Sequence, residues 1–445
     1  MGSFFTPFLG SAINVALPSI EREFSMNALM SSWVQASYLL AAAISLLPAG
    51  KLADIYGRKK IYSIGIAVFA LATLLCALAR DSTSLIIFRV MQGSGGALMF
   101  STSVAILTSV YPKEKRGRAL GFVVATVYTG LALGPGLGGL LTEYLGWRSV
   151  FYINLPLSFA TLFVVLRFLK GEWAEAGDEK FDFKGALLYA SSLFLIMTAL
   201  PKLPAANGFL LLASGTILLL LFIIYQRRAR FPLLNMDLFF RNRVFAFSNV
   251  AALINYSATF SVSFLLSLYL QHVRGFKADT TGLILILQAV VMAVFSPLAG
   301  RLSDRIDARI LASVGMSFTS VGLIILATFN NNTELPIILF SLFFLGFGFA
   351  LFSSPNTNAI MSAVEPRFYG VASSTTSTMR MVGQMLSMGI VMMIISFMLG
   401  DKMIGVDNAH DYLMAMKIAF LVFAVLCVTG VFASLARGKG KTSKT

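Results

Sequence analysis

Two arginines lie inside long apolar runs, where the chemistry open to them is the binding of an anion or a polar group. Arg89 starts the segment Arg-Val-Met-Gln-Gly-Ser-Gly-Gly, and Arg380 follows a stretch of serines and threonines. A guanidinium group in hydrocarbon is costly, so each side chain needs a partner or a water-filled cavity. We therefore predict that both arginines line a substrate cavity or are paired. For Arg89, the alternative is a side chain that extends to the nearby membrane surface.

Other polar side chains inside apolar runs are further candidates for the lining of a cavity. Gln92 shares a helical face with Arg89 because it lies three residues further on. Gln384 lies one turn beyond Arg380. The remaining candidates are Asn14, Gln35, Tyr38, Asn255, Tyr256, Asn356 and Asn358. Hydrogen bonding between neighbouring helices is the alternative explanation for each of them.

No set of residues predicts catalysis, a metal site or a cofactor. The two cysteines, Cys76 and Cys427, each lie in an apolar run without the spacing of metal ligands or of a disulfide framework. His272 and His410 are far apart in the sequence. The segment Gly440-Lys441-Thr442 lacks the upstream glycine of a phosphate-binding loop. We therefore predict that the protein is not an enzyme and uses no cofactor or metal.

The composition and the apolar runs predict the fold class. Hydrophobic residues make up 57% of the 445 residues and charged residues only 12%, whereas soluble domains have about 25% charged residues. A helix crosses a bilayer with about 20 mostly apolar residues. We predict an all-α membrane protein with 14 transmembrane helices. Their approximate bounds are 4–22, 32–52, 61–80, 83–110, 118–144, 147–168, 183–203, 207–227, 244–271, 280–302, 308–329, 335–361, 368–399 and 412–436.

The basic residues predict the orientation of these helices. The net charge is +15, but the basic residues lie in short loops rather than in patches, which argues against a nucleic-acid partner. If both termini are cytoplasmic, the inner segments carry 25 Lys and Arg and the outer loops seven. Cytoplasmic loops of membrane proteins carry such an excess of positive charge. We predict a multi-pass protein of the plasma (inner) membrane with both termini in the cytoplasm.

A loop motif occurs twice, 250 residues apart. Residues 50–59 and 300–309 share Gly, Leu, Asp and a final basic residue at the same offsets, each at a predicted cytoplasmic helix end. The positive-inside rule alone explains the basic residues but not the repeated Gly and Asp. We predict that this loop holds one closed state and releases it in another. The gating candidates are Gly50, Asp54, Gly57, Arg58, Gly300, Asp304 and Arg309.

The repeat predicts two homologous halves. We predict two pseudo-symmetric six-helix bundles, at 1–168 and 244–436, with cytoplasmic linkers and two inserted central helices between them at 169–243. A basic cytoplasmic tail follows at 437–445. Residues 228–243 are either an amphipathic segment on the membrane surface or a solvated linker.

The fifth apolar run is rich in glycine. Gly130, Gly134 and Gly138 form an i, i+4, i+8 stripe that permits close helix packing, and Pro135 permits a bend. Together with Gly139 these residues are candidates for a packing surface. The surface would either rock during transport or form a static contact.

These motifs together resemble those of the major facilitator superfamily, in particular its fourteen-helix drug:proton antiporter branch of the multidrug efflux type. The loop at 50–60, the segment at 89–96 and the glycine-rich segment at 130–139 are similar to three of its motifs. Further matches are Trp33 with Tyr38-Leu39-Leu40, Trp147-Arg148 with Phe151 and Asn154-Leu155-Pro156, and Tyr269-Leu270-Gln271. The resemblance covers nearly the whole chain.

The resemblance implies alternating access and proton-driven export of amphipathic compounds. One residue departs from the pattern, because the branch usually has an Asp nine residues before the proline that corresponds to Pro18. Here that residue is Leu9, and none of the 20 Asp and Glu residues lies deep in a predicted helix. Proton coupling usually needs a titratable group within the membrane.

Three functions follow from these features. The first is secondary active export of small amphipathic or lipid-like molecules, coupled to protons. The second is transport of anionic solutes or lipids that bind the intramembrane arginines, with unusual or no proton coupling. The third is a membrane sensor or structural partner that no longer transports. Membrane lipids are expected partners in each case.

Overall fold

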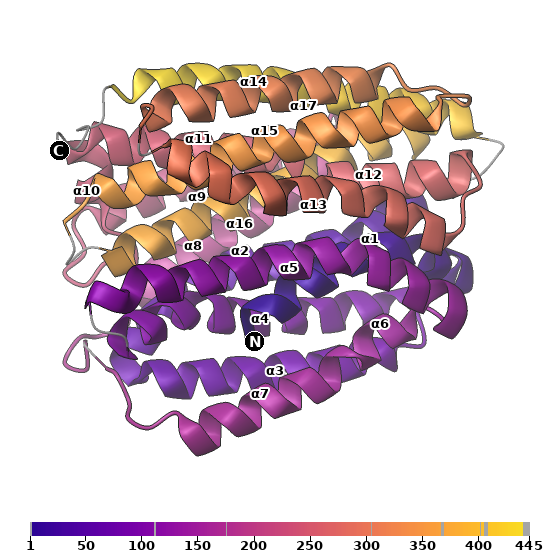
Figure 1. Ribbon diagram of the computed structural model, residues 1–445. Helices are drawn as coiled ribbons and strands as arrows, with labels where there is room; N and C mark the ends of the chain where they lie inside the picture. The colour runs from indigo at the N-terminus through magenta and orange to yellow at the C-terminus, as the bar shows by residue number, and fades with distance from the viewer. Residues whose placement is uncertain are drawn as a thin grey trace.

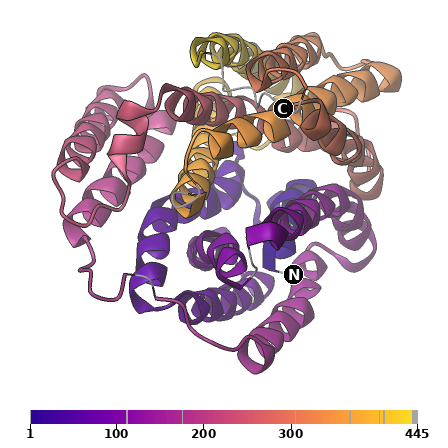
Figure 2. The ribbon, with the colours of Figure 1, turned by 60° about the vertical axis from the view of Figure 1, so that its left-hand side comes forward.

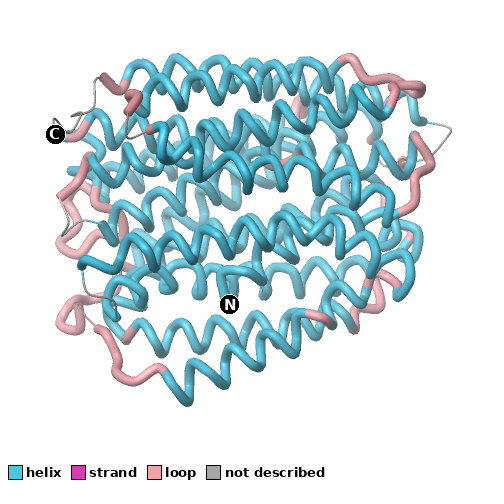
Figure 3. The backbone as a smooth tube through the Cα atoms, in the orientation of Figure 1, coloured by secondary structure: helices cyan, strands magenta, loops and turns pink. Residues whose placement is uncertain are grey.

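The computed structural model describes residues 2–110, 113–174, 176–303, 305–365, 369–400, 402–404 and 408–438. Of the side chains in these ranges, those of residues 3, 108, 113–122, 124, 125 and 237 are not described. The ordered elements of the described ranges are all helices (Figure 3). This confirms the predicted all-α class.

The helices fall into three consecutive sets. The first, here the N-terminal group, is α1 (Gly2–Phe24), α2 (Ala28–Tyr56), α3 (Arg58–Ala77), α4 (Ser82–Val110), α5 (Lys113–Leu145), α6 (Arg148–Tyr152) and α7 (Asn154–Phe168). The second is α8 (Phe183–Ala199), the 3-10 helix η1 (Leu200–Lys202), α9 (Ala206–Gln226) and α10 (Met236–Arg241). The third, here the C-terminal group, is α11 (Arg243–Thr259), α12 (Val262–Leu268), the π-helix η2 (Tyr269–Val273), α13 (Ala278–Leu302), α14 (Ala308–Ala327), α15 (Leu335–Ser362), α16 (Tyr369–Leu399) and α17 (Ala409–Ala436).

Twelve helical segments of the described chain are long and apolar enough to cross a membrane, and they match twelve of the fourteen predicted runs. The predicted number of fourteen is therefore supported for these twelve only. The other two runs correspond to α1 and α5. In α1, the polar Asn14, two prolines and the charged residues 21–23 lower the hydropathy. In α5, the side chains of the first ten residues are outside the described part of the structure.

The long helices run roughly parallel, and most loops gather at the two ends of the molecule (Figure 1). One end, here the basic end, holds the loop at residues 50–60, the segment 227–243, the turn after α13 and the end of α17. The other end, here the opposite end, holds the end of α1, the α5–α6 turn, η2 and the residues before α13. A bilayer would lie between these two ends.

The N-terminal and C-terminal groups lie side by side, and α8 and α9 form a pair beside them (Figure 2). Two seams join the groups, α5 against α13 and α2 against α16. The helix pair packs beside the second seam. Tyr189 of α8 donates to the Ala43 carbonyl of α2 (3.1 Å), and Ser396 of α16 donates to the Pro201 carbonyl of η1 (2.7 Å).

Several helix starts follow from side-chain capping. The side chains of Asn27, Asp182 and Asn242 accept hydrogen bonds from backbone N–H groups in the first turns of α2, α8 and α11. Such caps satisfy donors that the helix itself leaves free. Between α2 and α3, Gly57 has φ of +107°, a conformation that favours glycine. The sequence therefore marks these boundaries locally.

The predicted run at 244–271 matches one candidate membrane span, Arg243–Val273, but the helix in it is interrupted after Thr259. It ends as α11 at Thr259 and continues as α12 and the π-helix η2. Ser387 of α16 accepts hydrogen bonds from both the backbone N–H (3.1 Å) and the hydroxyl (2.9 Å) of Ser261 at the break. These bonds satisfy polar groups that a break in lipid would leave unpaired.

The segment at 228–243 is amphipathic. Leu234 and Met236 are buried, while Arg228 and Arg241 are exposed. Its backbone is tied down as well, because Gln226 accepts hydrogen bonds from the N–H groups of residues 233 and 234. These contacts contradict the solvated-linker alternative and agree with an amphipathic segment.

The glycine stripe of α5 packs on α1, within the N-terminal group. A Cβ atom at Gly130 would lie 2.7 Å from the Phe4 carbonyl oxygen, and one at Gly138 would lie 2.7 Å from Ala12 Cβ. At Gly134 it would lie 2.8 Å from the Phe8 carbonyl oxygen. The stripe therefore permits a close contact inside one group rather than between groups.

We expect Gly134→Ala to lower the thermal unfolding midpoint by roughly 3–10 °C, because overpacking costs about 1–3 kcal/mol. The matched control is Gly10→Ala on the facing helix, where a Cβ atom would meet nothing within 4 Å. That variant should match or exceed the wild-type midpoint, since alanine favours helix. Thermal unfolding of the detergent-solubilised proteins measures both, and equal midpoints would contradict the close packing.

Candidate functional site

Arg89 is fully buried in the N-terminal group and satisfied by neutral partners. Its Nε donates to the Val34 carbonyl (3.0 Å), Nη1 to Gln92 Oε1 (2.5 Å) and Nη2 to Gln35 Oε1 (3.0 Å). The guanidinium carbon lies 4.4 Å from the centre of the Tyr38 ring, a cation–π contact. With 0% of its surface exposed, Arg89 does not extend to the membrane surface, which contradicts that alternative.

The network around Arg89 joins four helices. Gln92 Nε2 donates to Thr73 Oγ1 of α3 (2.7 Å), and Gln35 Nε2 donates to the Gly10 carbonyl of α1 (3.2 Å). Each amide thus uses its oxygen for Arg89 and its nitrogen for another helix. Gln35, Gln92 and Tyr38, predicted as cavity residues, lie in this internal network.

Arg380 has a different environment. Its guanidinium carbon lies 5.6 Å from the Phe100 ring of α4 and 5.5 Å from the Tyr256 ring of α11. Its Nε is buried and has no hydrogen-bond partner among the described residues, and no carboxylate of that set pairs with it. Arg380 is therefore a half-buried cation between the two groups, with aromatic rings of both groups beside it and no hydrogen-bond partner for Nε among the described residues.

A second contact joins the groups near Arg380. The hydroxyls of Tyr128 of α5 and Ser353 of α15 are 3.1 Å apart. Arg380, Tyr256 and Ser296 all lie close enough to Tyr128 to interact with it electrostatically. We name Tyr128, Tyr256, Ser296, Ser353 and Arg380 the central cluster.

Tyr128, Ser296 and Ser353 were missed in the sequence because hydroxyl side chains are common in apolar helices. One signal could have found them. Tyr128 lies two residues before the glycine stripe, and the two serines lie close to Pro297 and Pro355. Prolines and glycines mark places where helices bend or approach one another.

The other candidates divide into free and engaged side chains. Asn14 and Asn255 are buried, and the Oδ1 atom of each has no partner among the residues described. Asn356 is engaged, since it donates to the Ser248 carbonyl (3.0 Å) and accepts from Arg437 (3.0 Å). Asn358 is exposed and bonds Ser303 near the basic end, away from the central cluster. Gln384 is half-buried on α16, one turn beyond Arg380.

The hydrogen bond from Arg437 to Asn356 holds the end of α17 in place. Arg437 is 2% exposed and also donates to the Ser248 hydroxyl (3.1 Å). Burial lowers the pKa of its guanidinium to about 10. A cation at a helix C-terminus interacts favourably with the helix dipole. Asn356 is therefore part of a structural contact.

Polar contacts between the groups concentrate at the opposite end. Gln271 Nε2 donates to the Val15 carbonyl (3.0 Å), and the His272 and Glu21 side chains meet at 2.7 Å. Lys277 and Glu143 are 3.5 Å apart. These pairs form a seal between α1 or α5 and the η2–α13 region. Among the residues with described side chains, no polar contact of this kind joins the two groups at the basic end.

The seal includes a close backbone contact between α5 and α13. A Cβ atom at Gly139 would lie 2.3 Å from the Ala278 carbonyl oxygen, and one at Gly282 would lie 2.1 Å from the Pro135 carbonyl oxygen. Hydrogen is the only side chain that fits at either position. Gly139 and Pro135 thus face the other group, whereas the predicted stripe faces α1.

At the basic end, the first copy of the repeated motif is held by its own residues. Arg58 donates from Nε (3.0 Å) and Nη2 (2.9 Å) to Asp54 Oδ1, and its Nη1 donates to Ser109 of α4 (2.7 Å). Gly50 lies near α4, where a Cβ atom would be 4.0 Å from Ser101 Cβ.

The linker after α7 folds over this motif. Glu172 accepts hydrogen bonds from the backbone N–H groups of Lys59 (2.8 Å) and Lys60 (3.1 Å), which caps the start of α3. The Trp173 carbonyl accepts from the Arg58 N–H (2.9 Å). A Cβ atom at Gly57 would lie 2.5 Å from the Glu172 carboxyl carbon. Glu172 was not predicted, since a capping residue far in the sequence from its helix leaves no local pattern.

The second copy of the motif is built differently. Asp307 accepts from the Arg309 backbone N–H (2.8 Å) and so caps α14, and it lies 3.8 Å from the Arg309 side chain. A Cβ atom at Gly300 would lie 2.9 Å from Ser354 Oγ. Asp304 lies outside the described residues. The predicted equivalence of Asp304 and Asp54 therefore stays a prediction.

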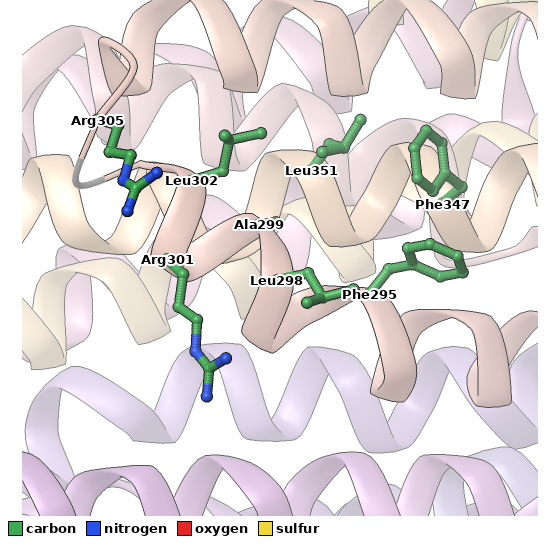
Figure 4. Close-up of a pocket in the computed structure, with 8 residues that line it drawn as sticks. All are labelled: Phe295, Leu298, Ala299, Arg301, Leu302, Arg305, Phe347 and Leu351. Atoms are coloured by element: carbon green, nitrogen blue, oxygen red, sulfur yellow. The ribbon is translucent and has the colours of Figure 1, made fainter.

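An open groove of about 630 Å³ lies between α13 and α15 at the basic end. Figure 4 shows the Arg301 side chain pointing away from Phe295 and Phe347. The groove is lined by Phe295, Leu298, Ala299, Arg301, Leu302, Arg305, Phe347 and Leu351. The groove thus combines apolar walls with two exposed arginines. Within the described residues, no group of three or more potential metal ligands occurs.

Comparison with known proteins agrees with this architecture. The sequence model of the Major Facilitator Superfamily matches residues 1–388 and 248–443. The chain is 30% identical over 381 residues to the riboflavin transporter RibZ of Clostridioides difficile, covering 85% of this chain and 83% of that protein. It is 33% identical over 394 residues to the multidrug resistance protein Stp of Mycobacterium tuberculosis, covering 87% and 73%.

A solved structure shares the fold. The crystal structure of the human organic anion transporter MFSD10 (TETRAN) matches with a TM-score of 0.62 at 14% identity. The match covers 97% of this chain and 99% of that one. At this identity the likeness shows the fold alone.

The two arginines should respond oppositely to replacement by methionine. We expect Arg89→Met to lower the unfolding midpoint by on the order of 5–10 °C, because it leaves buried acceptors on Gln35 and Gln92 without their donor. Arg380→Met removes a cation without polar partners, so its midpoint should stay at or above that of the wild type. Thermal unfolding of both variants in detergent measures this contrast, and a larger loss for Arg380→Met would refute it.

Proposed function

Because the chain belongs to the Major Facilitator Superfamily, a family of transporters rather than enzymes, we propose that it is a secondary active transporter that exports small amphipathic molecules by alternating access. The distribution of contacts between its two groups carries the proposal. The groups are sealed at the opposite end and share the central cluster midway along their seams. The relative Stp is named a multidrug resistance protein, and removal of a compound from the cell is one way in which a transporter gives resistance.

The proposed architecture is the fourteen-helix branch. We assign crossings to α1 and α5 as well, since α5 has 33 residues and packs along both α1 and α13. Residues 1–168 and 244–436 would then be two six-helix bundles, with 169–243 supplying linkers and the two inserted helices. We assign the basic end, and with it the tail at 437–445, to the cytoplasm of a bacterial cell because of the excess of Lys and Arg in the segments predicted to be cytoplasmic.

In this mechanism the sealed form is open to the cytoplasm and loads the substrate at the central cluster. The seal at Gly139 and Gly282 then opens while the basic end closes. The repeated motifs, with Asp54, Arg58 and Arg309, govern that closure. Gly57 and the Glu172 cap hold the first motif in the form seen in the sealed state.

Arg380 favours one second candidate, an anionic substrate. The sequence left both arginines open to this role, but Arg89 is fully enclosed by its own partners. Arg380 retains unused donors beside the Phe100 and Tyr256 rings. An aromatic carboxylate would satisfy both features, since guanidinium groups bind carboxylates and aromatic rings stack on one another.

We propose that the groove between α13 and α15 binds membrane lipids. Its apolar walls suit an acyl chain, and the exposed Arg301 and Arg305 suit a phosphate headgroup at the cytoplasmic surface.

Transport of two substrates that are alike in shape but differ in charge tests the function. We expect the reconstituted protein to move an aromatic carboxylate and its uncharged amide across liposomes. Arg380→Gln should slow the carboxylate by roughly ten- to a hundredfold, the effect of losing a charge-assisted hydrogen bond, and change the amide less than twofold. The control is Arg241→Gln, an exposed arginine at the basic end, which should change neither rate.

The outcomes separate the candidates. Equal slowing of both compounds by Arg380→Gln would exclude the anionic substrate but leave export intact. Failure of the wild type to move anionic, neutral or cationic amphiphiles would refute transport and favour the sensor or structural partner.

A further inference from the structure

Glu21 and His272 form a buried pair that joins the two groups at the opposite end. Glu21 lies near the end of α1, and His272 lies in the π-helix η2. His272 Nε2 is 2.7 Å from Glu21 Oε2, and the side chains are 14% and 7% exposed. The sequence alone gives neither residue a role. The structure brings them together across 251 positions of sequence.

The second oxygen of Glu21 is unsatisfied. Glu21 Oε1 is buried and lacks a hydrogen-bond partner among the described residues. The phenol of Tyr412 on α17 lies close enough to interact with this carboxylate, but it donates its hydrogen bond to the Leu265 carbonyl (2.7 Å). A buried carboxylate with one free oxygen is costly unless a cation compensates it.

Several other charged groups of this end have partners of their own. Arg22 donates to the Pro18 carbonyl, Glu23 pairs with Arg148, Glu143 with Lys277, Lys402 with Asp411, Asp279 accepts from Tyr144, and Arg274 donates to the Thr333 carbonyl. His410 and Lys417 line a separate groove with residues 330–332. Among the described residues, His272 is the one basic side chain that forms an ion-pair contact with Glu21.

We propose that Glu21 and His272 are a proton-binding site whose occupancy stabilises the sealed opposite end. A proton from water at that end binds to His272 and turns the 2.7 Å contact into an ion pair between the two groups. When the seal opens, the two side chains separate and each is hydrated on its own. The shared proton is therefore held better in the sealed form, and proton binding favours that form by linkage.

The direction of the pH response and its range follow from the types of the two side chains. Histidine is the side chain whose charge ordinarily changes between about pH 5 and 8. The sealed form should thus gain population as the pH falls from about 8 to about 5.5. Acid outside the cell would then favour the form that is open to the cytoplasm and ready to load.

This inference rests on the proposed alternating access and names where the proton acts. The branch usually places an Asp at the position of Leu9, which is 1% exposed inside α1. Glu21 lies on the same helix, twelve residues further along. The proton would therefore act at the seal rather than in the centre of the membrane.

Spin labels at residues 80 and 331 can test the proposal in nanodiscs. Both positions are exposed at the opposite end, one in each group, and the native Cys76 and Cys427 are fully buried. We expect pulsed electron paramagnetic resonance to show a short and a long distance, with the ratio of short to long rising on the order of tenfold from pH 8 to pH 5.5.

Matched variants isolate the pair, because the chain has two histidines. His272→Gln keeps a hydrogen-bonding side chain but cannot titrate in this range, so the pH response should disappear. Glu21→Gln should abolish it as well. His410→Gln, at an exposed position on α17, should retain the full response.

Three results would overturn the inference. One is a wild-type ratio that does not change with pH, another is a normal response in His272→Gln, and the third is loss of the response in His410→Gln alone. A single distance at every pH, and with transported substrate present, would refute alternating access itself. Two distances with no role for His272 would refute only the proton site.

Discussion

The rest of the structure depends on the close approach of α5 and α13 at the opposite end. At Gly139 and Gly282, the backbone of one helix meets a carbonyl of the other with room for hydrogen alone. Such a contact gains van der Waals energy without locking side chains together, so it can part and reform. The seal around it consists of a few polar pairs. The helices of each group, by contrast, are joined by buried networks and by tightly packed glycines.

The two intramembrane arginines show how environment decides the role of a residue type. Each guanidinium nitrogen of Arg89 donates a hydrogen bond inside the N-terminal group, to two amides and a carbonyl, and the Tyr38 ring lies against it. That network makes four helices one rigid unit. Arg380 stands where the two units meet, with aromatic rings on both sides and donors to spare. The proposed binding site thus lies at the boundary of the N-terminal group, beside a cation whose Nε has no partner among the described residues.

Hydropathy predicted the helices well because lipid imposes one dominant constraint on them. The predicted run at 83–110 became Ser82–Val110, and 368–399 became Tyr369–Leu399. Hydropathy did not reveal the interruption of the helix at Ser261, since the hydrogen bonds that permit it come from Ser387 on another helix. The polar composition of α1 likewise keeps it outside the twelve segments that meet the criterion.

The candidate site was predictable in part. Spacing placed Gln92 beside Arg89 correctly, because the two residues share one helix. The aromatic neighbours of Arg380 could not be predicted from the sequence. Neither could the contact of Tyr128 with Ser353 or that of Glu21 with His272. The last two contacts join segments more than 200 residues apart, and nothing local distinguishes such side chains from ordinary ones. The repeated Gly and Asp of the loop motif predicted its place in the fold, but not the cap that Glu172 adds.

A reversible lock on the seal tests alternating access most directly. Glu143 and Lys277 face each other at 3.5 Å across the two groups, so cysteines at both positions can be joined by a short methanethiosulfonate cross-linker that reductant releases. Substrate flux should stop in the cross-linked protein and recover after reduction, while each single-cysteine protein treated in the same way keeps its flux. Undiminished flux through the fully cross-linked protein would contradict the claim that the two groups must part at this end for transport.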